Sequence, residues 1–134
     1  MMGMEEEYEY SIEIRDPQTA IRRVRSGMNR WMRRDIGNFS YRLEIDHIHL
    51  RERCFKLVAT RFTPDGLMIV NSLDILLRKR SDGSWEALLR EEIEVHVYIP
   101  PTGYMKADIR GGEEEIRRHY SLIPYVLDSI AQTT

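Results

Sequence analysis

The pair His47 and His49 has residue types and a spacing that suit metal binding or the polarisation of a ligand. Residues two apart on a strand point to the same side of a sheet, so we expect both imidazoles to continue the apolar face of residues 41–45. A zinc site would need a third ligand, such as His96, His119 or a carboxylate. Neither of these histidines stands in a spaced motif with the pair. We therefore favour ordinary strand-end histidines, with a polar cavity lining as the alternative, and expect no bound metal and no cofactor.

A run of arginines marks the segment 16–34, which contains six arginines and a single acidic residue, Asp16. Arginine clusters suit anions because the guanidinium fork pairs with two oxygens at once. The residues that would contact an anionic partner, either nucleic acid or an acidic surface, are Arg22, Arg23, Arg30 and Arg33. The alternative is a solvated helix face that is neutralised by the glutamates between residues 5 and 13. The near-neutral net charge favours this alternative.

Two further residues could take part in binding or chemistry, but neither belongs to a catalytic motif. Asn71 interrupts an apolar alternation, and a buried amide without partners costs about 1–3 kcal/mol. It faces either a ligand or water, or it bonds a neighbouring backbone group, which we favour. Cys54 has no sequence context that would activate a thiolate. The doublet Gly111-Gly112 is too short for a phosphate-binding loop. We therefore expect binding rather than catalysis.

Composition limits the class of protein. The 134 residues amount to about one domain, which we place at 1–134. The balance of 20 basic and 22 acidic residues argues against a nucleic-acid binder, and 42% hydrophobic residues exclude a disordered chain. A single cysteine excludes an internal disulfide framework. The 17 arginines against 3 lysines fit either a thermophile or a GC-rich genome.

The segment near the start of the sequence is acidic where a secretory signal would be basic and then apolar, at Glu5, Glu6 and Glu7. No apolar stretch approaches the roughly 20 residues that a membrane span requires. We therefore expect a cytoplasmic protein without a membrane span.

Hydrophobic periodicity predicts the elements that must position these residues. Alternation over residues 8–14 predicts a strand with one buried face. Asp16-Pro17 begins a helix, with Asp16 as its cap, and Gly37 ends it. Gly27 lies inside this helix, costs roughly 1 kcal/mol of helix propensity and permits a bend or break.

The remaining chain alternates with period two and then returns to a helical period. Strands are predicted over 39–46, 54–63, 67–77, 85–99 and 104–109, with turns at 63–66 and 82–83. A last helix follows Gly111-Gly112 and should be kinked by Pro124. The predicted fold is α+β, in the order β-α-β(4-5)-α. An antiparallel meander of five to seven strands wraps the C-terminal helix, and both helices pack on one side.

This arrangement resembles the START or Bet v1-like superfamily, the helix-grip fold. The resemblance rests on the acidic strand 5–14, the helix entry 16–20, Trp31 and the final helix 112–131. Those domains usually have seven strands, whereas five or six are counted here, and Pro124 interrupts the last helix. The resemblance implies binding of lipids, sterols or other apolar small molecules, and in some members cyclase or dehydratase chemistry. A cystatin-like α+β fold is the alternative.

The resemblance therefore predicts a binding protein for an apolar or lipid-like small molecule, held between the sheet and the last helix. We expect a pocket of at least ~300 Å³. The candidate lining residues are Trp31, His47, His49, Asn71 and Tyr120. An interaction domain that uses the arginine-rich helix is the alternative, and an enzyme on the same scaffold is the third possibility. The sequence does not indicate an oligomeric state.

Overall fold

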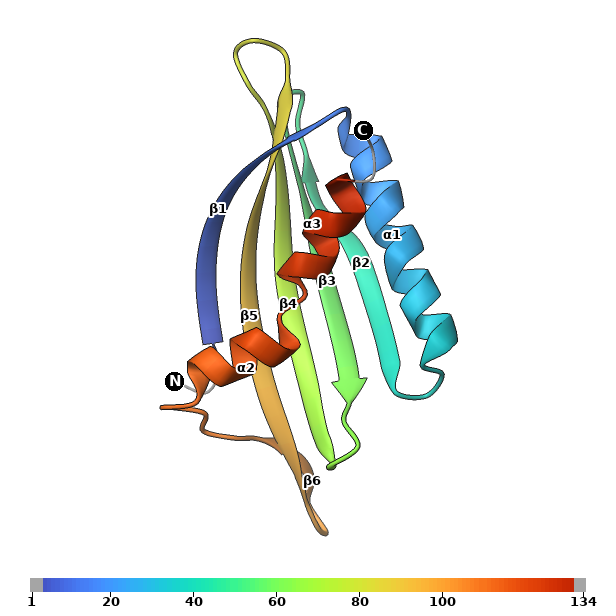
Figure 1. Cartoon of the computed structure of the whole chain (residues 1–134), viewed down its shortest axis with the longest axis vertical. Coiled ribbons are helices and arrows are strands. Elements are labelled where there is room, and N and C mark those ends of the chain that lie inside the picture. Colours follow the sequence, from blue (N-terminus) through green and yellow to red (C-terminus); the bar gives the residue numbers. More distant parts are fainter. Residues whose placement is uncertain (1–3, 132–134) are drawn as a thin grey trace.

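A computed structural model describes the backbone of residues 4–131 and the side chains of residues 12–131. Strands and helices follow the predicted order (Figure 1). The elements are β1 (Met4–Ile14), α1 (Pro17–Arg34), β2 (Phe39–Ile48), β3 (Glu52–Phe62), β4 (Leu67–Lys79), β5 (Trp85–Ile99), β6 (Gly103–Lys106), α2 (Glu113–Tyr120) and α3 (Ile123–Ala131).

All six strands form one antiparallel sheet in the order β1-β5-β4-β3-β2, with β6 paired to β5. Strands β2 to β6 are a meander, so each pairs with the next along the chain. Two of the predicted turns connect these strands, and both contain a glycine with positive φ, Gly66 at 89° and Gly83 at 90°. A side chain at such a φ would be strained, which is why glycine suits these turns.

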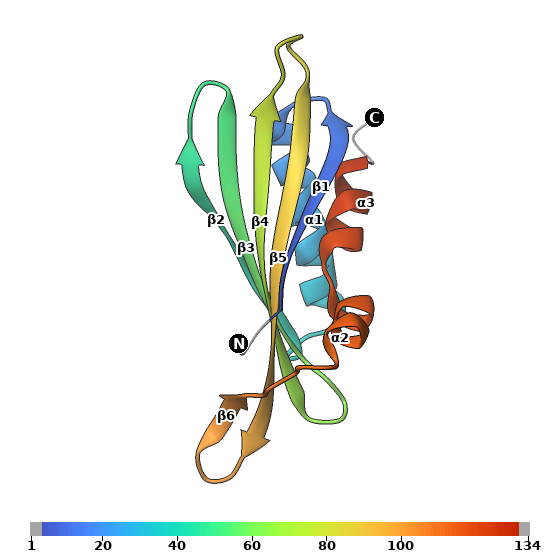
Figure 2. The same ribbon diagram turned by 90° about the vertical axis from the view of Figure 1, so that its left-hand side faces the viewer.

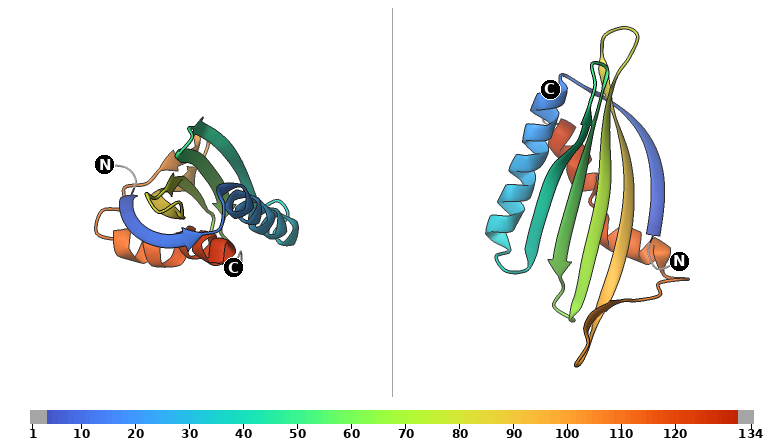
Figure 3. Two further views of the ribbon diagram at one scale, coloured as in Figure 1. Left: turned by 90° about the horizontal axis from the view of Figure 1, so that it is seen from above. Right: turned by 180° about the vertical axis from the view of Figure 1, so that it is seen from behind.

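The helices cover one face of the sheet, and the other face is open (Figures 1 and 2). Views from above and behind show the strong twist of the strands (Figure 3). Alternation along β4 shows the division, because the buried residues Ile69, Asn71, Leu73, Ile75 and Leu77 alternate with half-buried ones. The α+β fold, the antiparallel sheet and the placement of the helices on one side are thus confirmed.

The predicted C-terminal helix is broken rather than kinked. It forms α2 and α3, separated at Ser121-Leu122, and Pro124 is the second residue of α3. Proline is tolerated in the first turn of a helix, where its missing N–H would have no intrahelical acceptor. The proline therefore stands at the start of a helix, and the prediction that it lies inside one was wrong.

Helix α1 begins as predicted. Asp16 caps it by accepting hydrogen bonds from the Thr19 backbone N–H and the Thr19 hydroxyl, both at 2.7 Å. These bonds hold the pKa of Asp16 below its usual value. The predicted bend at Gly27 is absent, since α1 is one continuous helix from Pro17 to Arg34.

Removing this cap gives the first expected result. Asp16→Ala should cost about 1 kcal/mol of stability at neutral pH, because the first turn loses its acceptor. A lowered pKa means that the carboxylate contributes above its unfolded-state pKa and loses this contribution as the pH falls through the folded-state pKa. The difference from the wild type in urea unfolding should therefore shrink in acid. Asp16→Asn, which keeps a capping oxygen, should retain most of the neutral-pH stability. A pH-independent loss for Asp16→Ala would contradict this account.

Candidate functional site

Three of the predicted ligand-lining residues meet inside the molecule, around a side chain that the sequence analysis did not single out. The Arg61 guanidinium lies 5.3 Å from the centre of the Trp31 ring and 5.5 Å from that of Tyr120. It donates a hydrogen bond to Asn71 Oδ1 at 3.1 Å and another to the backbone carbonyl of Tyr120. Burial lowers the pKa of Arg61, against the opposing effect of nearby groups that include Glu91.

Asn71 and Glu91 complete this buried polar cluster. Their residues are 0% and 2% exposed. The Asn71 amide donates to Glu91 Oε2 at 3.1 Å and to the Tyr120 carbonyl at 2.8 Å. The other acceptor contacts of Glu91 are with the Ser121 hydroxyl at 2.6 Å and the Leu122 N–H at 2.8 Å. The cluster thus ties the sheet to the break between α2 and α3. The favoured interpretation of Asn71, a bond to a neighbouring backbone group at an irregular point of its strand, was wrong, because the strand is regular at Asn71 and the backbone acceptor is the distant Tyr120 carbonyl.

The sequence holds a signal for the two residues that were missed. Arg61 continues the buried phase of β3, after Leu57 and Ala59, and Glu91 stands between Leu89 and Ile93 in the buried phase of β5. A charged residue at an apolar position of two different strands indicates a paired buried cluster. The positions of Arg61 and Glu91 in their strands therefore marked both as candidates for a buried polar cluster.

His47 lies on the opposite face of the sheet, so the prediction that it continues the apolar face was wrong. Opposed residues of antiparallel strands share a face, and Ile45 opposes Phe55 whereas His47 opposes Cys54. The register shifts between Ile45 and His47, and one extra residue in a strand exchanges its faces. The His49 ring lies 5.0 Å from that of His47. The histidine pair therefore does not join Trp31, Asn71 and Tyr120.

The arginine-rich helix presents its charges to solvent. On α1, Arg22, Arg23, Arg30 and Arg33 are exposed, and at 3.6 residues per turn they fall within about 100° of arc around the helix. We call these four residues the arginine face. Among the side chains that the structure describes, none of the four forms an ion pair with a carboxylate within 4 Å. Arg22 contacts the Thr19 hydroxyl at 3.3 Å, and its charge acts on the nearby Asp16 carboxylate.

Glutamates of the first strand were predicted to neutralise the arginines of the helix. The side chains of four of them are outside those that the structure describes: Glu5, Glu6, Glu7 and Glu9. The backbone nevertheless limits this neutralisation. Strand β1 is one edge of the sheet, whereas α1 packs over β2, the opposite edge (Figure 1). The two elements approach each other where β1 leads into α1, and the end of the helix that carries Arg30 and Arg33 lies away from that connection (Figure 1).

An apolar groove adjoins the arginine face at this end of α1. Its volume is about 440 Å³, and we call it the α1–β2 groove. It is lined by Met32, Arg33, Ile36, Gly37, Phe39, Ser40 and Phe62. Ile36 is 82% exposed although it is aliphatic. Arg33 belongs to both the groove and the arginine face, so the two surfaces are continuous.

Two other grooves have different characters. One of about 540 Å³ runs along α2 and α3 and includes Arg117 and Leu127. A polar one of about 220 Å³ lies on the open face of the sheet and includes Lys56 and Asp74. Because all three grooves are lined by residues other than those predicted to hold an apolar ligand, the ligand cavity stays a prediction.

Comparison of the chain with protein families, curated proteins and solved structures gave no match. Within residues 4–131, no helix is long and apolar enough to cross a membrane. The resemblance to helix-grip domains therefore stays an expectation.

Proposed function

We propose that this domain is a protein-interaction module that binds an acidic polypeptide segment. The arginine face of α1 contacts the carboxylates of the segment, and the α1–β2 groove takes its apolar side chains. The observation that carries the proposal is the set of four exposed arginines that form no ion pair within 4 Å with the described carboxylates. Guanidinium groups pair with carboxylates through two parallel hydrogen bonds, so this surface is complementary to an acidic one.

The groove favours a polypeptide over the other anionic partners. A nucleic acid offers phosphates to the arginines but no aliphatic groups for Met32 and Ile36, whereas a peptide offers both. An acidic segment with interspersed apolar residues meets both the arginine face and the groove.

Binding should be measured with a fluorescent peptide of glutamates interspersed with leucines, by anisotropy over a series of salt concentrations. We expect affinity to fall as salt rises, because exposed ion pairs are screened. The triple variant Arg22→Ala/Arg23→Ala/Arg30→Ala should bind about tenfold more weakly or worse, since each exposed pair contributes up to ~1 kcal/mol. Ile36→Ser should weaken binding to the leucine-containing peptide but not to polyglutamate.

The matched control removes three arginines elsewhere. Arg42, Arg110 and Arg118 already contact Glu44, Asp108 and Glu115 at 3.1, 2.5 and 3.0 Å, so their replacement changes the net charge equally and leaves the arginine face intact. Equal losses for the two triple variants would show that net charge alone controls binding. Tighter binding to single-stranded DNA or to phosphatidylserine vesicles than to the peptide would also overturn the proposal.

A further inference from the structure

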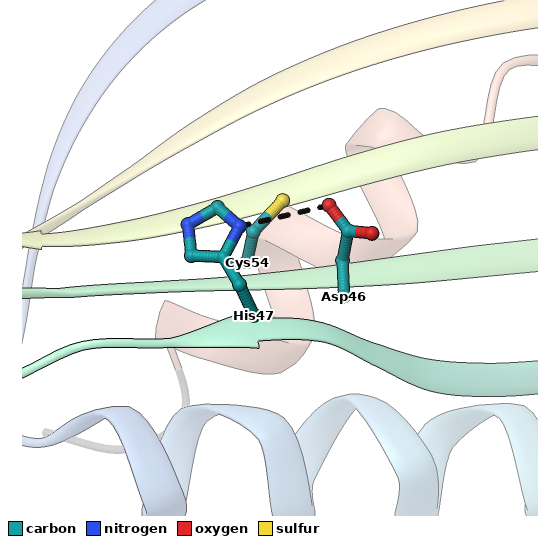
Figure 4. A group of neighbouring side chains, drawn as sticks. All are labelled: Asp46, His47 and Cys54. Carbon is teal, nitrogen blue, oxygen red and sulfur yellow. Dashed lines mark ion pairs between the residues drawn. The ribbon is translucent and has the colours of Figure 1, made fainter.

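Three potential metal ligands lie close together on the open face of the sheet. None of them belongs to the arginine face. Figure 4 shows Asp46 and His47 from β2 and Cys54 from β3 with their side chains directed toward one another. One ligand atom from each residue lies within 4.8 Å of the other two. An imidazole, a thiol and a carboxylate form a donor set that zinc binds well.

The register shift in β2 creates this cluster. Consecutive residues of a regular strand point to opposite faces, so Asp46 and His47 would be separated by the sheet. The bulge between Ile45 and His47 places both on the open side, where His47 opposes Cys54. The bulge therefore brings the three potential ligands to the same side of the sheet.

The contacts of His47 orient its ring for a metal. Its Nε2 lies 3.0 Å from Glu52 Oε1, and its Nδ1 lies 3.7 Å from Asp46 Oδ2. When Nε2–H donates to Glu52, the lone pair of Nδ1 is directed toward Asp46 and Cys54. Ligating histidines commonly have such a carboxylate on the other ring nitrogen, which fixes the tautomer and increases ligand basicity.

The surroundings of Cys54 favour a cation. Its thiol lies near the carboxylates of Asp46, Asp74 and Glu52. Three carboxylates close to one thiol produce a negative potential, and a divalent ion would neutralise part of it. The His49 ring, 5.0 Å from that of His47, is near enough to serve as a fourth ligand after a rotation.

We propose that Asp46, His47 and Cys54 form a zinc site with Glu52 as the outer partner of His47. Zinc bonds of about 2.0–2.3 Å place ligand atoms roughly 3.5 Å apart, so the present spacing requires side-chain shifts of about an ångström. Three protein ligands leave the fourth position for water or His49. The third ligands considered from the sequence are placed differently. His96 contacts Glu94 at 3.1 Å, and His119 on α2 contacts Glu115 at 3.3 Å.

Zinc and cobalt titrations of the metal-free protein test this site. We expect one equivalent of zinc by calorimetry, and a sulfur-to-cobalt charge-transfer band with Co²⁺ that zinc abolishes. Cys54→Ser, His47→Gln and Asp46→Asn should each weaken zinc binding at least about tenfold, and Cys54→Ser should remove the charge-transfer band. Glu52→Gln should weaken zinc binding by about 10–100-fold while the band remains, because its effect acts through His47.

Control variants separate this site from adventitious binding. His96→Gln and His119→Gln each remove a histidine paired with a glutamate and should leave zinc affinity unchanged. Thermal unfolding of each metal-free variant checks that the fold is intact. The proposal is wrong if zinc fails to bind the folded wild type, if the ligand variants bind it as well as the wild type does, or if the control variants lose affinity equally. The arginine-face proposal is unaffected by any of these outcomes.

Discussion

Glu91→Ala is expected to destabilise the protein by about 3–5 kcal/mol, the largest loss among the substitutions considered. The Glu91 carboxylate accepts hydrogen bonds from the Asn71 amide, the Ser121 hydroxyl and the Leu122 N–H. Alanine leaves these buried donors without an acceptor, and each unsatisfied buried group costs about 1–3 kcal/mol. It also removes a nearby carboxylate whose negative charge favours the charged form of the half-buried Arg61 guanidinium. Both effects add to the loss of packing.

The comparison should use urea unfolding with several variants. Glu44→Ala, at an exposed position on β2, controls for the loss of a glutamate and should cost under ~1 kcal/mol. Glu91→Gln keeps the size and one oxygen, so it should fall between Glu91→Ala and the wild type. Adding Asn71→Leu to Glu91→Ala should cost less than the sum of the two single changes, because the orphaned donor is removed with its acceptor. A loss below 1 kcal/mol for Glu91→Ala would refute the role assigned to the cluster.

The fold was largely predictable because its signals are local. Alternation with period two identifies the strands, and the glycines at positions 66 and 83 identify two of the turns between them. A run of strands joined by short turns folds into a meander, so the antiparallel sheet followed without knowledge of long-range contacts. The apolar stripe of α1 and its cap at Asp16 are likewise properties of neighbouring residues.

The errors concern features that depend on register or on distant partners. Nothing in the pattern around Ile45 marks the bulge that exchanges the faces of β2, so His47 was placed on the wrong side. At the break before α3, the Leu122 N–H donates to Glu91, which lies 31 positions earlier in the chain. Proline alone predicts an irregularity but not where the helix ends.

The candidate sites divide in the same way. The helical period placed the arginines of α1 on one face, but whether they have carboxylate partners depends on which strands flank the helix. The histidine pair was noted, but its proposed partners Asp46 and Cys54 become neighbours through the bulge and the pairing of β2 with β3. Sequence patterns thus identified the arginines and the histidine pair as candidates, whereas the strand order and the register of the sheet determined which residues lie next to them.

Gly27→Leu is the second substitution expected to have a large effect, about 1–3 kcal/mol of destabilisation. Gly27 stands where α1 crosses α3, and a Cβ built on it would lie 3.0 Å from Ser129 Oγ. The two helices pack closely around this point through Val24 and Met28 on α1 and Val126 and Ile130 on α3. A leucine would push the helices apart and reduce this packing. Glycine at this position therefore allows the two helices to pack closely, and it does not act as a hinge.

Alanine at this position should behave differently from leucine. The Ser129 hydroxyl can rotate away from a single methyl group at the cost of its exposed hydrogen bond to the Tyr125 carbonyl, and alanine gains up to ~1 kcal/mol of helix propensity over glycine. Gly27→Ala should therefore lie within about 1 kcal/mol of the wild type, and Gly27→Ala/Ser129→Gly should relieve any residual contact. Ser26→Leu, at an exposed position of the same helix, provides the size-matched control. Thermal and urea unfolding of these variants measure the differences in stability. If Gly27→Leu proved as stable as Ser26→Leu, the contact between α1 and α3 would not be tight enough to require glycine.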